Sequence, residues 1–268
     1  MDLELTGKNV VVTGASQGIG LAIAQAFATQ GARLALIART EATLAQAQQA
    51  LANAGHKVHI IAANLSDAAA AEAAIAQAEA LLGGIDVLVN SAGAARRSEP
   101  ESLDPALWRA ALEAKFFPYI HAQDAVLRRW LAQAKAQHTP LGHAIVNVVG
   151  TGGKQPTATH LPGGSANAAL LLSSVGLAKH YAQYGVRINV INPGFTYTGR
   201  VDQAISLEAQ RRGISKEQAL RDAEAQVPLG RFAQPEEVAD LALFLASARA
   251  RFITGAVVPI NGGADPVI

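Results

Sequence analysis

A glycine-rich segment directly after the first apolar run constrains the fold of this chain most. Residues 13–20 read TGASQGIG and follow the apolar run NVVV at residues 9–12. The three glycines permit a tight turn and let the backbone approach a pyrophosphate closely, and a helix beginning there points its amides at the phosphates. The alternative is a tight strand-to-helix turn without a ligand. The cofactor contacts expected from this turn are Gly14, Ser16, Gln17, Gly18, Ile19 and Gly20.

Short apolar runs alternate with long alanine-rich segments along the rest of the chain. The runs are apolar at consecutive positions and flanked by Gly, Asn, Asp or Pro, which is typical of strands buried on both faces. The pattern predicts an α/β fold: a Rossmann-like doubly wound parallel sheet with helices on both faces. The expected strands are residues 9–12, 34–37, 59–62, 87–90, 144–148, 187–191 and 257–260, and the expected helices include 21–30, 41–54, 68–82 and 236–246.

Helix start and stop signals accompany these segments. Ser66 stands where an N-cap is expected and Pro235 where a first-turn proline is expected. Gly31 and Gly55 stand where helices are expected to end.

The organisation of the chain predicts one domain covering residues 1–268. There is no internal repeat and no linker between two halves. The longest strand-poor stretch is a polar, charged insertion around residues 201–226, between two expected strands. It is expected to form helices over the mouth of the site as a lid; the alternative is a surface excursion without a functional role.

Composition narrows the class of protein. The formal net charge is +1, so no basic field indicates nucleic acid or a membrane surface. The chain has no cysteine, which excludes disulfides and thiolate metal sites, and no metal is expected. No basic segment precedes an apolar stretch at the N-terminus, and no apolar run reaches the roughly 20 residues of a membrane span. We expect a soluble, cytoplasmic protein.

The residues after the second expected strand indicate which nicotinamide cofactor binds. An NAD site commonly has an acid here for the ribose hydroxyls, whereas a basic residue suits the phosphate of NADP. This chain has Ile37, Ala38 and Arg39. Arg39 therefore favours NADP, with NAD still possible; the alternative is that Arg39 is a solvated surface charge.

In this order, these segments resemble the short-chain dehydrogenase/reductase family over nearly the whole chain. TGASQGIG matches the family's TGxxxGxG motif, NSAG at residues 90–93 is similar to NNAG, and NPGFTYT at 192–198 is similar to its PG loop. FITGAVVPINGG at 252–263 matches the family's C-terminal strand. The resemblance implies a nicotinamide cofactor, a small-molecule substrate and a homo-oligomer, often a tetramer.

The same resemblance implies further cofactor contacts. Asn64 and Leu65 fall where the family has an Asp and an aliphatic residue at the adenine, and Asn keeps one acceptor there. The backbone of the NSAG segment would line the adenine ribose, and the PG loop with Ile191 would flank the nicotinamide, with Thr198 on its carboxamide. The contacts implied in these two loops are Asn90, Ala92, Gly93, Pro193, Gly194 and Thr198.

The catalytic positions of the family depart from its usual Asn, Ser, Tyr and Lys. Alignment of AIVNVVG at residues 144–150 puts Gly150 at the serine, and Gly163 and Asn167 then follow at the tyrosine and lysine. LWRAALEAKFFPYI at residues 107–120 puts Lys115 at the asparagine. The usual tyrosine mechanism is therefore not available, but Lys and Asn are exchanged between two positions that face one pocket in the family.

Four residues are candidates for the chemistry that remains. Lys115 is expected to hold the ribose or polarise a carbonyl oxygen with Asn167 opposite; it could instead be a surface or interface charge. His160 is the best general acid or base nearby, or else a solvated loop histidine. Thr151 is the hydroxyl nearest the missing serine, or a structural residue. Tyr197 is the tyrosine nearest the cofactor by motif, although packing or a lid role suits it as well.

Two functions follow, and turnover separates them. The first is an atypical NADP-dependent oxidoreductase acting on a carbonyl or alcohol, in which the cofactor carries the hydride chemistry. The second is a catalytically silent relative that acts as a cofactor-binding sensor or as an oligomer subunit. The retained PG loop favours the enzyme, and the missing catalytic set favours the silent relative. A scaffold that binds no nucleotide conflicts with TGASQGIG.

Overall fold

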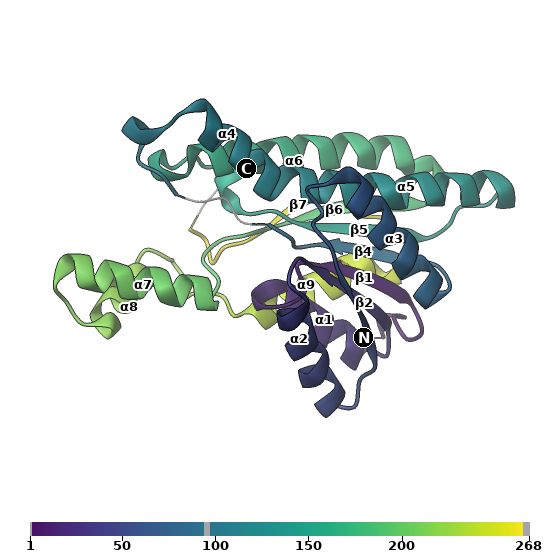
Figure 1. Ribbon diagram of the computed structural model, residues 1–268, viewed down its shortest axis with the longest axis horizontal. Helices are drawn as coiled ribbons and strands as arrows, with labels where there is room; N and C mark the ends of the chain where they lie inside the picture. The colour runs from purple at the N-terminus through teal and green to yellow at the C-terminus, as the bar shows by residue number, and fades with distance from the viewer. Residues whose placement is uncertain (1, 94–96, 265–268) are drawn as a thin grey trace.

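Seven parallel strands form one sheet in the order β3-β2-β1-β4-β5-β6-β7, in a computed structural model that describes residues 2–93 and 97–264 (Figure 1). The order reverses beside β1, as in a doubly wound fold. All seven expected strands are present, and β6 is longer by one residue at its start and two at its end. The strands are β1 Asn9–Thr13, β2 Arg33–Ala38, β3 Val58–Ala62, β4 Val87–Asn90, β5 His143–Val148, β6 Val186–Pro193 and β7 Val257–Ile260.

Helices cover both faces of the sheet, which is why the strands are apolar at consecutive positions. In Figure 1, α1, α2 and α9 lie below the sheet, and α3, α5 and α6 lie above it. Val10 and Val12 of β1 pack with the first group, whereas Val11 between them packs with the second. The helices are α1 Gly18–Thr29, α2 Glu41–Asn53, α3 Ala68–Leu82, α4 Pro105–Ala111, α5 Phe117–Gln137, α6 Leu161–Tyr181, α7 Gly199–Arg212, α8 Lys216–Glu224 and α9 Pro235–Ala246.

The helix boundaries follow the sequence signals with one correction. Asp67, not Ser66, is the N-cap of α3: its carboxylate accepts a hydrogen bond from the Ala70 amide at 2.7 Å. Ser66 lies one residue too early and its hydroxyl donates to Asn64 instead. Pro235 begins α9, and Gly31 and Gly55 follow α1 and α2 in the left-handed region, as predicted.

The insertion forms α7 and α8, which project from the sheet at the left of Figure 1. A small apolar cluster holds the two helices together, and its buried members are Ile205, Ala209, Ala219, Val227 and Phe232. The Asp202 carboxylate of α7 pairs with Lys216 of α8 at 2.7 Å. The insertion therefore packs on itself as a unit beside the sheet.

Among the described residues, one helix meets the length and composition of a membrane span, contrary to the expectation from the sequence. It lies within residues 158–184 and has a mean hydropathy of 1.2. Half of that stretch is buried inside the protein, where α6 packs on β6 and on Tyr119 of α5. A core helix of an α/β fold passes the same test, because the face that packs on the sheet is apolar.

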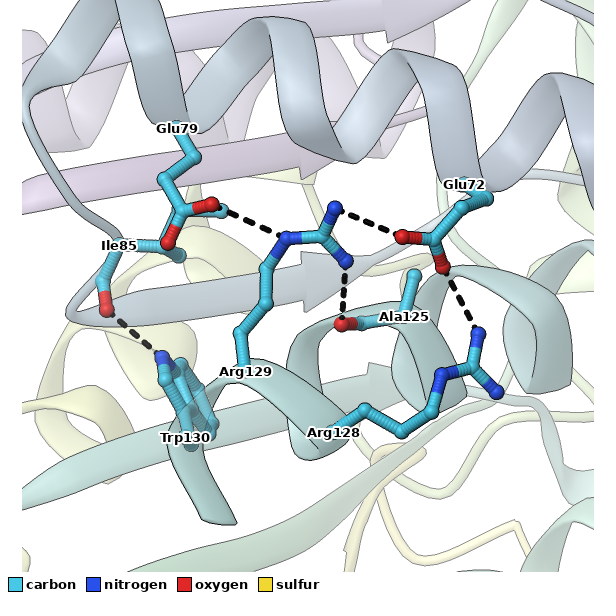
Figure 2. A network of polar contacts seen from close by, with 7 residues as sticks. All are labelled: Glu72, Glu79, Ile85, Ala125, Arg128, Arg129 and Trp130. Carbon is cyan, nitrogen blue, oxygen red and sulfur yellow. Dashed lines mark hydrogen bonds and ion pairs between the residues drawn. The ribbon is translucent and has the colours of Figure 1, made fainter. Parts of the chain in front are cut away.

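An ion-pair network joins α3 and α5 (Figure 2). Arg129 of α5 pairs with Glu72 at 2.7 Å and with Glu79 at 3.0 Å, both on α3, and Arg128 pairs with Glu72 at 2.8 Å. Beside them the indole of Trp130 donates to the Ile85 carbonyl. Arg129 is the more buried of the two arginines and bridges two carboxylates, so it contributes more to the stability of this contact.

Arg129→Met is expected to lower the free energy of unfolding by about 1 kcal/mol at neutral pH, since the carboxylates are partly exposed and screened. Arg129 and then Arg128 lower the pKa of Glu72. A carboxylate whose pKa is lower in the folded than in the unfolded protein stabilises the folded state at pH values above the unfolded-state pKa. This stabilisation is lost as the pH falls through the folded-state pKa. Urea unfolding should therefore separate wild type from variant at neutral pH and bring them together in acid. Arg128→Met, with one exposed pair, is the control and should cost a few tenths of a kcal/mol; equal losses would contradict the bridging role.

Candidate functional site

A cavity of about 820 Å³ opens at the carboxyl ends of the strands. Residues directly after β1, β2, β3, β4, β5 and β6 line it, which is where ligands bind in doubly wound sheets. Eighteen of the nineteen site residues predicted from the sequence line this cavity. They are Gly14, Ser16, Gln17, Gly18, Ile19, Gly20, Arg39, Asn64, Leu65, Ala92, Gly93, Lys115, Thr151, His160, Asn167, Pro193, Gly194 and Thr198.

The glycine turn after β1 is packed so closely that two of its glycines cannot carry a side chain. A Cβ on Gly20 would lie 2.2 Å from the Gly14 carbonyl oxygen. A Cβ on Gly14 would lie 2.6 Å from the Ser91 carbonyl oxygen, and Gly14 has φ +67°. Helix α1 starts at Gly18, and the residues of its first turn line the cavity. This arrangement fits a pyrophosphate held by backbone amides.

Arg39 follows β2 at the edge of the same cavity. Its side chain is exposed, and it forms no ion pair within the described part of the chain. Thr40 and Thr43 line the cavity beside it. A guanidinium with two nearby hydroxyls is a suitable partner for a phosphate on a ribose.

Asn90, the remaining predicted contact, lies behind the cavity. It is fully buried at the end of β4, where its side chain accepts from Thr13 and donates to Asn147 at 3.0 Å. Asn147 donates in turn to Gln123 and Ser174. These bonds direct the Asn90 side chain into the core and not into the cavity. The contact predicted for the NSAG segment is made through its backbone, so it stays a prediction for Asn90. The contact predicted for Ile191 is wrong, because Ile191 is fully buried in β6 and does not line the cavity.

Lys115 is a buried cation of the cavity wall, not a surface charge. It lies in η2 (Leu112–Phe116), a π-helical turn between α4 and α5, and only 8% of it is exposed. Its Nζ donates to the Tyr119 hydroxyl at 3.0 Å and to the Val148 carbonyl at 3.3 Å. The Tyr119 hydroxyl itself donates to the same carbonyl. These bonds hold the ammonium beside the end of β5.

Sequence reasoning missed Tyr119. The signal was present, because residues four apart lie on one face of a helix and Lys115 and Tyr119 have that spacing. Tyr119 is fully buried and does not line the cavity. Burial raises its pKa, so the phenol remains protonated and orients Lys115 rather than exchanging a proton with a ligand.

His160 and Asn167 both line the cavity beside Gly152. The imidazole Nε2 and the Asn167 amide nitrogen are both 3.6 Å from the point that a Cβ on Gly152 would occupy. Among the described residues, neither His160 Nδ1 nor Asn167 Oδ1, both buried, has a hydrogen-bond partner. Buried polar atoms without partners are costly, so both sites suit a hydrogen-bonding ligand.

The charge state of His160 follows from its surroundings. Burial lowers the pKa of His160, and the nearby cations Arg97 and Lys115 lower it further. The imidazole is therefore neutral at neutral pH, with one nitrogen able to accept a proton.

The loop after β5 packs directly on α6 through glycines. A Cβ on Gly153 would lie 2.9 Å from the Ala168 amide nitrogen, and one on Gly164 would lie 2.8 Å from the Gly152 carbonyl oxygen. Gly150, which the sequence alignment predicts at the family's serine, has φ +128° and donates its amide to Asn192. An L side chain is strained at that φ, so a serine does not fit the present backbone. Gly163, predicted at the tyrosine position, is buried in the first turn of α6.

Tyr197 does not take the place of that tyrosine. Its hydroxyl donates to the Asp202 carboxylate of α7 at 3.2 Å, and it does not line the cavity. Thr151 does line the cavity, in a short helical turn after Gly150. The polar groups that meet in one place are therefore Lys115, His160, Asn167 and Thr151.

Comparisons with known proteins agree with this geometry. The family model described as enoyl-(acyl carrier protein) reductase matches residues 14–265. D-beta-hydroxybutyrate dehydrogenase of Cupriavidus necator is 34% identical over 264 residues, covering 97% of this chain and 98% of that protein. L-sorbose reductase of Gluconobacter frateurii, solved with NADPH and L-sorbose, has a TM-score of 0.92 at 28% identity and full coverage of both chains. A variant of actinorhodin polyketide ketoreductase with NADPH has a TM-score of 0.89 at 27% identity, covering 97% of this chain and 98% of that one.

Proposed function

Since the chain belongs to the short-chain dehydrogenase/reductase family, we propose that it is an NADP-dependent oxidoreductase with a non-standard active site, acting on a carbonyl or alcohol. The single observation that supports this most is the joint lining of one cavity by the glycine turn, Arg39, Lys115 and His160. The solved neighbours with NADPH support NADP over NAD. The proposal also includes a small-molecule substrate, a cytoplasmic location and a homo-oligomer, which is a tetramer in many family members.

The roles proposed for the side chains follow from their contacts. Bound NADPH would supply the hydride. The Lys115 ammonium, oriented by Tyr119, would donate a hydrogen bond to the carbonyl oxygen and stabilise the charge that develops there. His160 would exchange the proton with that oxygen, and its pKa, lowered by burial, suits the base of alcohol oxidation in particular. Asn167 and Thr151 would position the substrate or the ribose.

A specific observation also favours the second function, a catalytically silent cofactor-binding sensor or oligomer subunit. Gly150 has a backbone conformation that disfavours the family's serine, and Gly163 has no side chain at the tyrosine position. Turnover decides between the two functions. Oxidation of NADPH by the pure protein with any of a panel of ketones and aldehydes supports the enzyme, whereas tight NADPH binding without turnover across that panel supports the silent relative.

The first experiment is the melting temperature with NADPH and with NADH. A ligand at about a hundred times its Kd adds about 2.7 kcal/mol, which is roughly 5–10 °C for a domain of this size. We expect that shift with NADPH and a smaller one with NADH. The absence of a shift with either would contradict a functional cofactor site.

Arg39→Glu is expected to weaken NADPH by about 30- to 100-fold, because it replaces a charge-assisted hydrogen bond by repulsion. NADH should be affected by less than a few-fold. Titration calorimetry of both cofactors measures the two effects. Arg33→Glu is the matched control, since Arg33 is an exposed arginine at the start of β2 that does not line the cavity. Equal losses for the two cofactors would contradict the assignment of the phosphate to Arg39.

A further inference from the structure

The end of the cavity away from Arg39 has an excess of positive charge. Arg97 lines it from the loop after β4, Lys115 from η2 and His160 from the loop before α6. Glu113 is the acidic side chain among the described lining residues, and it is not among the charges that act on His160. Two cations thus face one imidazole from two separate segments.

Arg97 is held toward this end of the cavity by backbone and side-chain bonds. The amide of Ser98 donates to the Thr159 carbonyl at 2.9 Å, and Arg97 Nη1 donates to the Thr159 hydroxyl at 3.4 Å. Among the described residues, Arg97 forms no ion pair with a carboxylate. Arg97 is exposed and lines the cavity, so a ligand can reach it. Such a group recognises a carboxylate by paired, charge-assisted hydrogen bonds.

We propose that the substrate is a short oxo acid, whose carboxylate pairs with Arg97 while its carbonyl oxygen lies between Lys115 and His160. This inference rests on the proposed oxidoreductase function and names its substrate class. Bound NADPH, held by the glycine turn and Arg39, would supply the hydride to the carbonyl carbon and become NADP⁺. The C=O π bond breaks, the oxygen takes a proton from His160, and the product is the hydroxy acid. Solvent then returns the proton to His160.

The same charges explain how His160 would acquire that proton. In the free protein, the positive charges of Arg97 and Lys115 both oppose protonation of His160. The neighbouring side chain from α6, Asn167, is neutral and does not offset them. A bound carboxylate offsets the two positive charges, so the imidazole gains a proton more readily in the complex. Binding of the acid substrate would therefore favour protonation of His160, and this proton is the one that reduction of the substrate consumes.

The test compares short 2-oxo, 3-oxo and 4-oxo acids with their methyl esters, which keep the ketone and lack the charge. We expect kcat/KM to favour the best acid over its ester by about 10- to 100-fold, the value of one charged contact. In Arg97→Met this ratio should fall to about one. Lys154→Met, an exposed cation of the neighbouring loop that does not line the cavity, should retain the full ratio. With the acid, the pH profile of kcat should also extend to higher pH than with the ester.

A binding measurement separates failure of this inference from failure of the oxidoreductase proposal. Calorimetry of acid and ester on the protein saturated with NADP⁺ reads the anion site without turnover. If the protein binds the acid more tightly than the ester, and Arg97→Met abolishes this preference, the anion site is supported. This result is independent of turnover. The absence of turnover with every substrate would overturn the proposed enzyme but not the anion site. Equal binding and equal turnover of acid and ester overturn the oxo acid and leave the oxidoreductase standing.

Discussion

Gly20→Ala is expected to lower the affinity for NADPH by a factor on the order of 10² or more. The new Cβ would lie 2.2 Å from the Gly14 carbonyl oxygen, so the backbone of the turn must move. Gly14 has little room to shift, since it has φ +67° and even a Cβ on it would lie 2.6 Å from the Ser91 carbonyl oxygen and 2.7 Å from Ala92. Each charge-assisted bond to phosphate that is lost removes about 1.5–3 kcal/mol of binding. Overpacking should also lower the free energy of unfolding by about 1–3 kcal/mol.

The matched control for this substitution is Gly176→Ala. Gly176 lies on an exposed face of α6, and a Cβ there would meet nothing within 4 Å. A helical Gly→Ala change of this kind should raise stability by up to about 1 kcal/mol and leave NADPH binding unchanged. Thermal unfolding with and without NADPH gives both quantities. Undiminished NADPH binding by Gly20→Ala would show that the phosphates lie elsewhere.

Lys115→Met should lower kcat/KM by about 10²- to 10³-fold, the range for removal of one donor to a developing oxyanion. Stability should change little or rise, because methionine fills the same space without the desolvation cost of a buried ammonium. A large loss of activity at unchanged stability distinguishes a catalytic role from a structural one. Lys154→Met is the control with an unchanged rate. Full activity of Lys115→Met on the best substrate found would remove Lys115 from the mechanism.

Tyr119→Phe tests how Lys115 is held. The phenylalanine keeps the ring and removes the hydroxyl that Lys115 contacts at 3.0 Å. We expect a loss of about 10-fold in kcat alone. The double variant should be no worse than Lys115→Met, since Tyr119 acts through Lys115 and effects within one unit are not additive. Additive losses would indicate an independent role for the phenol.

The architecture could be predicted from the sequence because burial on both faces leaves a strong pattern. Each strand is a short apolar run, and β4 and β7 have the predicted bounds. The cap of α3 was misplaced because Ser66 and Asp67 are both good capping residues, and only the start at Ala68 decides between them. The apolar character of α6 was underestimated because it is spread over many alanines and small residues.

The sequence predicted which residues line the candidate site better than it predicted the hydrogen bonds between them. Lys115, His160 and Asn167 all line the one cavity, and their catalytic roles stay a prediction. The bond from Lys115 to Tyr119 follows from their spacing of four residues, whereas the π-helical turn around Lys115 has no local sequence pattern that predicts it. The side chain of Asn90 lies in the core because it bonds to Asn147 there, which the motif alone does not indicate. Arg97 was missed because its relevance comes from pairing with the distant Thr159 segment.

The turn at residues 151–153 packs closely on α6, and this contact restricts which substitutions near Gly150 can be made first. Gly152, Gly153 and Gly164 meet there at backbone distance, and Gly150 beside them has φ +128°. A serine introduced at Gly150 alone would find a backbone unsuited to it, so this turn would have to withdraw from the helix first. Introduction of a serine at Gly150 should therefore be epistatic: the loop would have to be replaced first, and the serine alone should be destabilising.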